Sequence, residues 1–279
     1  MLLDIEHRFA FDYDAYISES FIELRVHPKT TGDQTVNSFV LSVGPPTRVH
    51  RFLDWNDNVT HHFTITRFHN RIEVASRSLV STHPAAPTIG SITDRVPAGD
   101  LPYPLLDFLA LGGPVQATPA LRAAHKAATP RKGAALGEHV LAVGHHLAKH
   151  FEYRKDVTEY DSTTEDFLKI RAGVCQDFAH VTVGALRSLG VPARYISGYL
   201  VPVRDTEVGE TSKGESHAWV EYWDGGWTPV DPTNGTEVGV DHVVVARGRD
   251  YEDVSPFKGI YSGRATASLG VVVAITRLA

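Results

Sequence analysis

The stretch from Gly173 to Pro192, GVCQDFAHVTVGALRSLGVP, contains a helix whose two ends are both marked in the sequence. Residues that suit a packed face recur at helical spacing: Phe178, Thr182, Ala185 and Leu189. The final Gly190-Val191-Pro192 is a strong helix stop, because glycine suits the position after a helix and proline cannot continue it. The helix is therefore expected to begin close to Cys175, just after a flexible glycine.

The position of Cys175 at a helix start favours a reactive thiol. A helix start leaves backbone N–H groups without partners and carries roughly half a positive charge. That field favours thiolate over thiol, and the same N–H groups could bind an oxyanion. Cys175 is the single cysteine, which leaves no disulfide framework, CxxC pair or thiolate-rich zinc site. A lone cysteine is often only a small buried hydrophobe, so its place at a helix start makes it a candidate nucleophile.

A second stretch, SHAWVEYW at residues 216–223, alternates as a strand does. Small and apolar side chains are expected on one buried face, and His217 and Trp219 on the other. Asp224-Gly225-Gly226 predicts a turn, and residues 227–231 (WTPVD) predict a returning strand that Pro232 closes.

The length of that turn decides which side chains meet. With a three-residue loop, Trp223 pairs with Trp227, and His217 lies diagonally across the hairpin from Asp231 on one face. Their Cβ atoms would then be roughly 7 Å apart, within reach of a hydrogen bond. A two-residue loop would place the two on opposite faces.

These three side chains predict nucleophilic acyl transfer. Asp231 would fix the tautomer of His217, His217 would take the thiol proton, and Cys175 would attack a carbonyl to form a thioester. Water or an amine would then resolve the acyl-enzyme.

The amino-terminal part reads as β structure. Residues 21–26, 62–66 and 71–75 are short alternating runs punctuated by Gly, Pro and Asn, which favours a sandwich or small barrel ending near Thr82. A Pro- and Gly-rich connection follows.

Helices follow this connection. One begins near Pro119, and another spans about 135–151 with a single apolar stripe. The run Ser162-Thr163-Thr164-Glu165 has the form of a capping box. Near the carboxyl end, residues 269–275 are continuous enough to predict a strand buried on both faces.

Three motifs resemble the bacterial transglutaminase-like superfamily of papain-like thiol enzymes. They are GVCQDFAH…LRSLGVPARYISGYL, then SHAWVEYW…GW…DPTNG, and finally ARGRDYEDVSPFKGIYSG. The amino-terminal segment is similar to the β domain that precedes the core in the same group. The resemblance implies that Cys175, His217 and Asp231 are catalytic and that no cofactor is needed. It also implies that the nucleophile's own amide and an upstream side chain bind the oxyanion; that side chain is left unassigned.

We therefore expect an α+β protein with an antiparallel β domain at residues 1–85, a linker at 86–117 and a papain-like core with C-terminal strands at 118–279. In the core, a helix bearing the cysteine would pack on an antiparallel sheet.

Gln176, Asp177 and Trp219 are further candidates to bind substrate or to support the triad. Asp177 could instead complement the helix dipole, and Trp219 could simply pack against cross-strand aromatics. His180 is more readily a core histidine. A metal site is not expected, since of the histidines between 139 and 150 only two share a helix face and no third ligand is fixed by spacing.

Charge and composition limit the classes of partner that the protein is expected to bind. The net charge of −6 gives no support to a nucleic-acid or anionic-membrane partner, since both reward a basic surface. No run of about eighteen apolar residues occurs, and no signal peptide is visible, so cytoplasmic residence is the expectation. The expected partner is a peptide or protein substrate; the sequence leaves the oligomeric state open.

The sequence supports a cysteine-dependent peptide or amide hydrolase acting through a thioester. Protein-glutamine transglutaminase chemistry is the alternative, because partition depends on whether water or an amine reaches the acyl group. A non-catalytic binding scaffold is a third interpretation, although a scaffold would not need all three triad residues.

Overall fold

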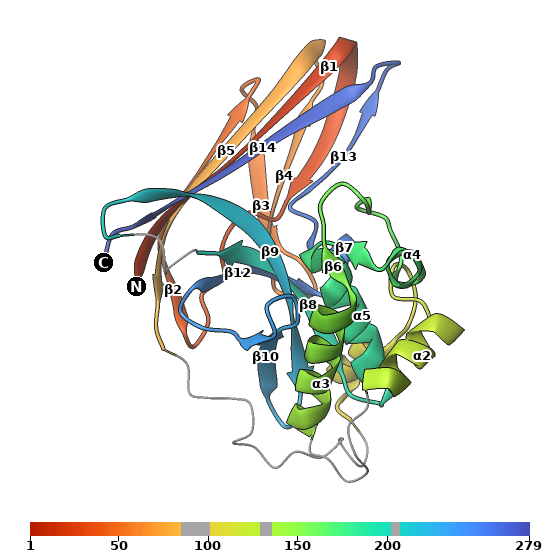
Figure 1. The fold of residues 1–279 in the computed structure, drawn as a ribbon. Helices are drawn as coiled ribbons and strands as arrows, with labels where there is room; N and C mark the ends of the chain where they lie inside the picture. Colours follow the sequence, from red (N-terminus) through yellow and green to blue (C-terminus); the bar gives the residue numbers. More distant parts are fainter. Residues whose placement is uncertain (85–100, 129–135, 202–206) are drawn as a thin grey trace.

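The computed structural model describes residues 1–84, 101–128, 136–201 and 207–279. Within these residues the strands form a large antiparallel sheet of 12 members, and helices gather against one part of it (Figure 1). The expected α+β class with a helix packed on antiparallel strands is confirmed.

The long first strand organises the amino-terminal part. β1 (Leu2–Leu24) pairs along its first half with β5 (His69–Thr82) and β14 (Ala267–Arg277). Its second half pairs with β4 (Val59–Ile65) and β13 (Phe257–Ser262). The two ends of the chain therefore share strands, and both termini lie side by side in Figure 1.

The strands predicted in this region lie largely within β1, β4 and β5, and the region ends at Thr82 as expected. Two further strands, β2 (Gln34–Gly44) and β3 (Val49–Leu53), pair with β5 and β4. Apolar side chains from both halves of β1 enclose a core of their own, which includes Phe9, Leu24, Phe63 and Ile72.

The carboxyl-terminal strand differs from its prediction. β14 forms, but its expected burial on both faces is wrong, because Leu269, Val271 and Val272 are 53%, 47% and 55% exposed. The reason is its position in the sheet. β14 pairs with β9 only through residues 273–276, so just its last part reaches the covered core, where Val273 and Ile275 are buried.

Four helices form a layer on the second part of the sheet: α2 (Pro119–Ala128), α3 (Leu136–His150), α4 (Thr164–Ile170) and α5 (Cys175–Ser188). α5 packs directly on β8 and β9, and the other three pack against α5. The predicted starts of α2 and α5 are confirmed, and α3 matches its prediction within the described residues. The apolar stripe of α3 is buried at Leu136, Val140, Val143 and Leu147. The helix stop also behaves as predicted, since Gly190 has φ +78° and Val191 N–H donates to the Leu186 carbonyl.

The capping box of α4 lies one residue later than predicted. Thr163 accepts a hydrogen bond from the Asp166 N–H, and the Asp166 carboxylate accepts one from the Thr163 N–H. A short aspartate therefore closes the box in place of Glu165.

The sheet under the helices consists of β12 (His242–Gly248), β8 (Ala193–Leu200), β9 (Thr211–Trp223), β10 (Trp227–Asp231) and β11 (Thr236–Glu237), in that order. The short elements are α1 (Tyr103–Leu106), η1 (Asp107–Leu109), β6 (Glu152–Tyr153), β7 (Ala172–Gly173) and α6 (Tyr251–Val254). Because β14 pairs with the start of β9, one sheet runs through both parts of the molecule. The boundaries at residues 85 and 117 stay a prediction.

Gly198 on β8 lies where Trp219 of β9 and the backbone of Val243 on β12 leave no room for a Cβ atom. We expect Gly198→Ala to lower the free energy of unfolding by about 1–3 kcal/mol through overpacking. Urea unfolding followed by Trp fluorescence measures this. Gly226→Ala, whose Cβ would meet nothing within 4 Å, is the control and should change stability little. Equal effects of the two substitutions would contradict the packing at Gly198.

Candidate active site

Two short strands place the amino terminus of α5. β6 pairs in parallel with β7, so that Tyr153 is the partner of Gly173, two residues before the cysteine. A side chain at Gly173 would collide with Asp177 and Phe167, so the chain can approach the helix start this closely only with glycine. Cys175 is the first residue of α5, as predicted, and is partly exposed.

Asp177 and Gln176 hold this helix start in place. The Asp177 carboxylate is buried and accepts hydrogen bonds from the Val174 N–H and the Thr158 hydroxyl, both at 2.8 Å. Gln176 donates from Nε2 to the Tyr160 carbonyl at 2.9 Å. Both residues therefore lie beside the candidate nucleophile, where they tie α5 to the segment that precedes it.

The β9–β10 hairpin has the predicted register. Trp223 pairs with Trp227, and the intervening Asp224–Gly226 forms the loop, in which Gly225 has φ +106°. His217 and Asp231 consequently meet, and His217 Nε2 donates to Asp231 Oδ2 at 2.8 Å. Because Nε2 bonds to the carboxylate, Nδ1 is the ring nitrogen left for another partner, and Cys175 lies close enough to the ring to raise its pKa.

The Asp231 carboxylate is fully buried and receives several donors. Its Oδ1 accepts the backbone N–H groups of Thr233 and Asn234, and its Oδ2 accepts Asn234 Nδ2 at 2.7 Å. These bonds come from the turn that follows Asp231, so the motif DPTNG folds back to orient its own aspartate.

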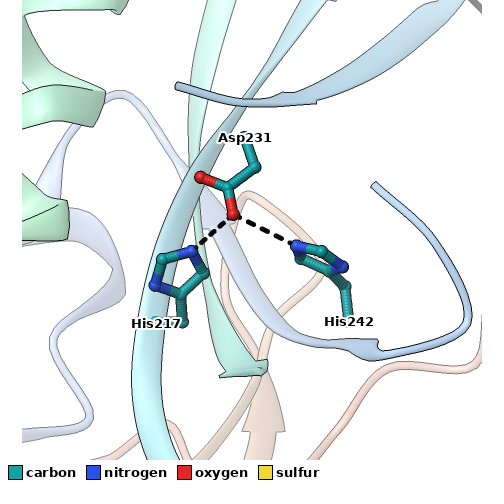
Figure 2. A group of neighbouring side chains, drawn as sticks. All are labelled: His217, Asp231 and His242. Carbon is teal, nitrogen blue, oxygen red and sulfur yellow. Dashed lines mark hydrogen bonds and ion pairs between the residues drawn. The ribbon is translucent and has the colours of Figure 1, made fainter. Parts of the chain in front are cut away.

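A second histidine, His242, contacts Asp231 from the other side (Figure 2). Its Nε2 lies 3.3 Å from the same Oδ2 that His217 uses, and its Nδ1 lies 2.7 Å from Asp241 Oδ1. His242 is the first residue of β12, which joins the site only through β8. No spacing motif marks His242 in the sequence, since ten residues separate it from Asp231 and give no signal.

Two family models match this chain. A family model described as transglutaminase-like superfamily matches residues 122–232, and one described as bacterial transglutaminase-like N-terminal region matches residues 3–81. An uncharacterised protein of Mycobacterium leprae is 37% identical over 99% of this chain and 98% of its own length. The chain belongs to the transglutaminase-like superfamily.

Other similarities are more distant. A candidate cysteine protease of Cytophaga hutchinsonii has the same fold, with a TM-score of 0.81 and 24% identity over 98% of this chain and 90% of that one. A protein-glutamine gamma-glutamyltransferase of Pseudomonas aeruginosa is 40% identical over 76 residues, which is 25% of this chain and 11% of that protein.

In this superfamily member, none of the helices within the described residues has both the length and the apolar character to cross a membrane.

The buried charged groups of the site stabilise one another electrostatically. Burial opposes a charge on His217, but hydrogen bonds to Asp231 and Cys175, with the negative charge of both, raise the pKa of His217 to about 10. Burial also opposes the Asp231 carboxylate, yet hydrogen bonds from His217 and His242 keep its pKa below the ordinary value. His242 likewise has a raised pKa, because its bonds to Asp231 and Asp241 outweigh its burial. The chain of groups therefore favours an imidazolium at His217.

A metal ion is the other ligand that such a cluster could hold. The ligand atoms of His217, Asp231 and His242 lie within 4.8 Å of one another in the described part of the chain. Hydrogen bonds from both rings to one carboxylate oxygen already account for this spacing. We therefore interpret the cluster as a hydrogen-bonded chain.

Trp219 is completely buried, so it packs within the site and does not reach solvent. Its ring stacks on His217 at 6.1 Å and meets His242 edge-on at 5.2 Å, which supports both imidazoles. The prediction of one buried face for β9 is therefore incomplete, because both faces are covered from His217 to Tyr222.

His180 is a buried core histidine, as expected. Its Nε2 accepts the Tyr251 N–H at 3.1 Å, and burial lowers its pKa to about 3.

The pKa of His217 predicts how the site affects stability. Its folded value of about 10 lies above the unfolded value of about 6.5, so its contribution is complete below about pH 6.5 and is lost as the pH rises through 10. His217→Asn should therefore destabilise the protein more at about pH 6 than at about pH 10.5. Urea unfolding at both pH values measures the difference. The exposed β3 residue His50, changed to Asn, is the control; a His217 effect independent of pH would contradict the prediction.

Proposed function

We propose that this protein is a cysteine-dependent hydrolase of peptide or amide bonds that acts through a thioester. The observation that carries the proposal is the buried His217–Asp231 hydrogen bond, with Cys175 at the start of α5 close enough to raise the pKa of His217. The three residues come from different elements, α5, β9 and β10, and this arrangement supports their proposed roles as nucleophile, base and orienting acid.

Acylation would proceed by transfer of one proton through His217. The imidazole takes the thiol proton at Nδ1, and the Cys175 sulfur attacks the carbonyl carbon of the substrate. His217, now an imidazolium that Asp231 stabilises, returns the proton to the departing amine as the C–N bond breaks. The raised pKa of His217 suits this step, since it keeps the proton available on the ring.

Two groups are candidates to stabilise the oxyanion. The first is the Cys175 N–H, which lies in the first turn of α5 and so has no intrahelical acceptor. The second is the hydroxyl of half-exposed Tyr153, a residue whose backbone pairs with Gly173 in β6–β7. Burial and the negative charge of Cys175 raise the pKa of Tyr153 to about 12, so the phenol remains a proton donor. We propose Tyr153 as the upstream donor.

Deacylation decides between the two activities of the proposal. Water activated by His217 would release a carboxylic acid, and an amine at the same place would form a new amide. The similarity of 76 residues to a gamma-glutamyltransferase supports amine transfer as the second candidate. A scaffold role is disfavoured because His217, Asp231 and His242 are buried together, which costs stability without an evident structural return.

The single cysteine allows a stoichiometric test of the nucleophile. Iodoacetamide should label one site per folded chain, and Cys175→Ala should take up no label. On a library of blocked peptides analysed by mass spectrometry, both Cys175→Ala and His217→Asn should lose hydrolysis by about 10³-fold or more. Cleavage that survives in Cys175→Ala would overturn the proposal.

A parallel incubation with a glutamine-containing protein and a biotinylated amine separates the two activities. If the protein incorporates the amine but cleaves no peptide, and Cys175→Ala abolishes the incorporation, the activity is amine transfer and not hydrolysis.

Removing the Tyr153 hydroxyl should lower kcat and leave KM nearly unchanged, because the oxyanion exists only near the transition state. We expect Tyr153→Phe to reduce kcat by about 10²-fold on the best library peptide. Tyr103→Phe removes a hydroxyl from an exposed position on α1 and is the control. Equal kcat values for the two variants would exclude Tyr153 as an oxyanion donor.

A further inference from the structure

A cleft of about 1060 Å³ lies between the amino-terminal strands and the part of the chain that carries the candidate active site. One wall consists of β1, β13 and β14, and the other includes Tyr160 and Ser216. A volume of this size exceeds what a single side chain fills and can hold several residues of a peptide ligand.

The β wall is apolar by strand alternation. Phe9, Phe11 and Tyr13 of β1 face the cleft, as do Leu269 and Val271 of β14, while Val272 does not. The exposure of Leu269 and Val271 gives this wall open apolar surface. Exposed apolar surface that is concave and contiguous marks binding sites more often than chance exposure does.

His7 extends this wall on β1. It lies on the same strand face as Phe9, it is 2% exposed, and its Nδ1 is 2.9 Å from the Tyr199 hydroxyl. Burial lowers the pKa of His7 to about 3, so the ring is neutral. This part of the wall therefore carries no charge that would oppose an apolar side chain.

Two residues that line the cleft connect it to the candidate active site. Ser216, which lines it, directly precedes His217, and Tyr160, which also lines it, holds Gln176 through its carbonyl. Gln176 is the neighbour of Cys175, so a chain lying in the cleft would extend toward the nucleophile. This continuity favours a substrate over a second copy of the protein as the occupant.

We propose that this cleft binds the apolar side chains of a peptide substrate whose scissile carbonyl reaches Cys175. The inference rests on the proposed function and adds the substrate class: peptides with aromatic or large aliphatic residues near the bond that is attacked. The amino-terminal β strands are thereby part of the substrate site. The lining has two acidic side chains, Asp161 and Glu252, and one basic side chain, Lys258. This excess of negative charge disfavours acidic peptides.

Peptidyl chloromethyl ketones test this without a known natural substrate. The Cys175 sulfur attacks the methylene carbon and displaces chloride, so that one thioether forms and the thiol proton is released. The probes are acetyl-Phe-Leu-Gly and acetyl-Asp-Glu-Gly chloromethyl ketones, with iodoacetamide as the probe of the thiol alone. We expect the full chain to react at least about tenfold faster with the apolar peptide than with the acidic one.

Two variants on one strand provide the matched comparison. Leu269→Glu places a charge in the cleft, and Val272→Glu places the same charge at a similarly exposed position that does not line it. Leu269→Glu should abolish most of the roughly tenfold preference, and Val272→Glu should keep it. Both should react with iodoacetamide as the unsubstituted protein does.

Each outcome has a separate meaning. An unreactive thiol toward iodoacetamide in the unsubstituted protein removes the proposed function, and the inference with it. A reactive thiol with no apolar preference, or a preference that Leu269→Glu leaves intact, overturns the cleft and leaves the proposed function standing. Sedimentation of the same proteins adds one more outcome. A dimer that only Leu269→Glu dissociates would assign the face to a second copy and so overturn the peptide proposal.

Discussion

The buried hydrogen bond from His217 Nε2 to Asp231 Oδ2 is the interaction on which the site depends. It orients the imidazole and leaves Nδ1 as the ring nitrogen free for another partner, and it stabilises a positive charge on the ring. A buried carboxylate is costly unless its oxygens are satisfied. Here the turn after Asp231 and the imidazole of His242 supply the donors. These surrounding groups hold the carboxylate in place for its hydrogen bond with His217.

The sheet connects this bond to the rest of the molecule. β9 carries His217, pairs with β10 that ends in Asp231, and pairs at its beginning with β14. β14 in turn pairs with β1, so the first strand of the chain is joined to the strand of the candidate base. This explains why the cleft that we assign to substrate has one wall from the amino-terminal strands. The two family matches, at residues 3–81 and 122–232, thus fall on parts that share one sheet.

Some predictions were wrong for identifiable physical reasons. The apolar run at 269–275 has the composition of a strand buried on both faces, but burial depends on what covers the strand, and only its last residues reach the core. Conversely, the alternation in β9 predicted one buried face, whereas both faces are buried from His217 to Tyr222, and Val244 of β12 packs with Trp219 on the second face. The local sequence pattern indicates that a segment prefers strand structure. The exposure of its side chains depends on the elements that pack against it.

The sequence by itself determined the local features of the site. Gly173 and Gly190 bound α5 and so place Cys175 at a helix start, and the three residues of the Asp224–Gly226 turn bring His217 and Asp231 to one face. These features act over a few residues, where backbone geometry leaves few choices. Only the tertiary structure decided that His242 shares Asp231, that Tyr153 pairs with Gly173, and that the amino-terminal strands form one wall of the cleft. Such contacts arise from the pairing of distant strands, and no spacing along the chain encodes them.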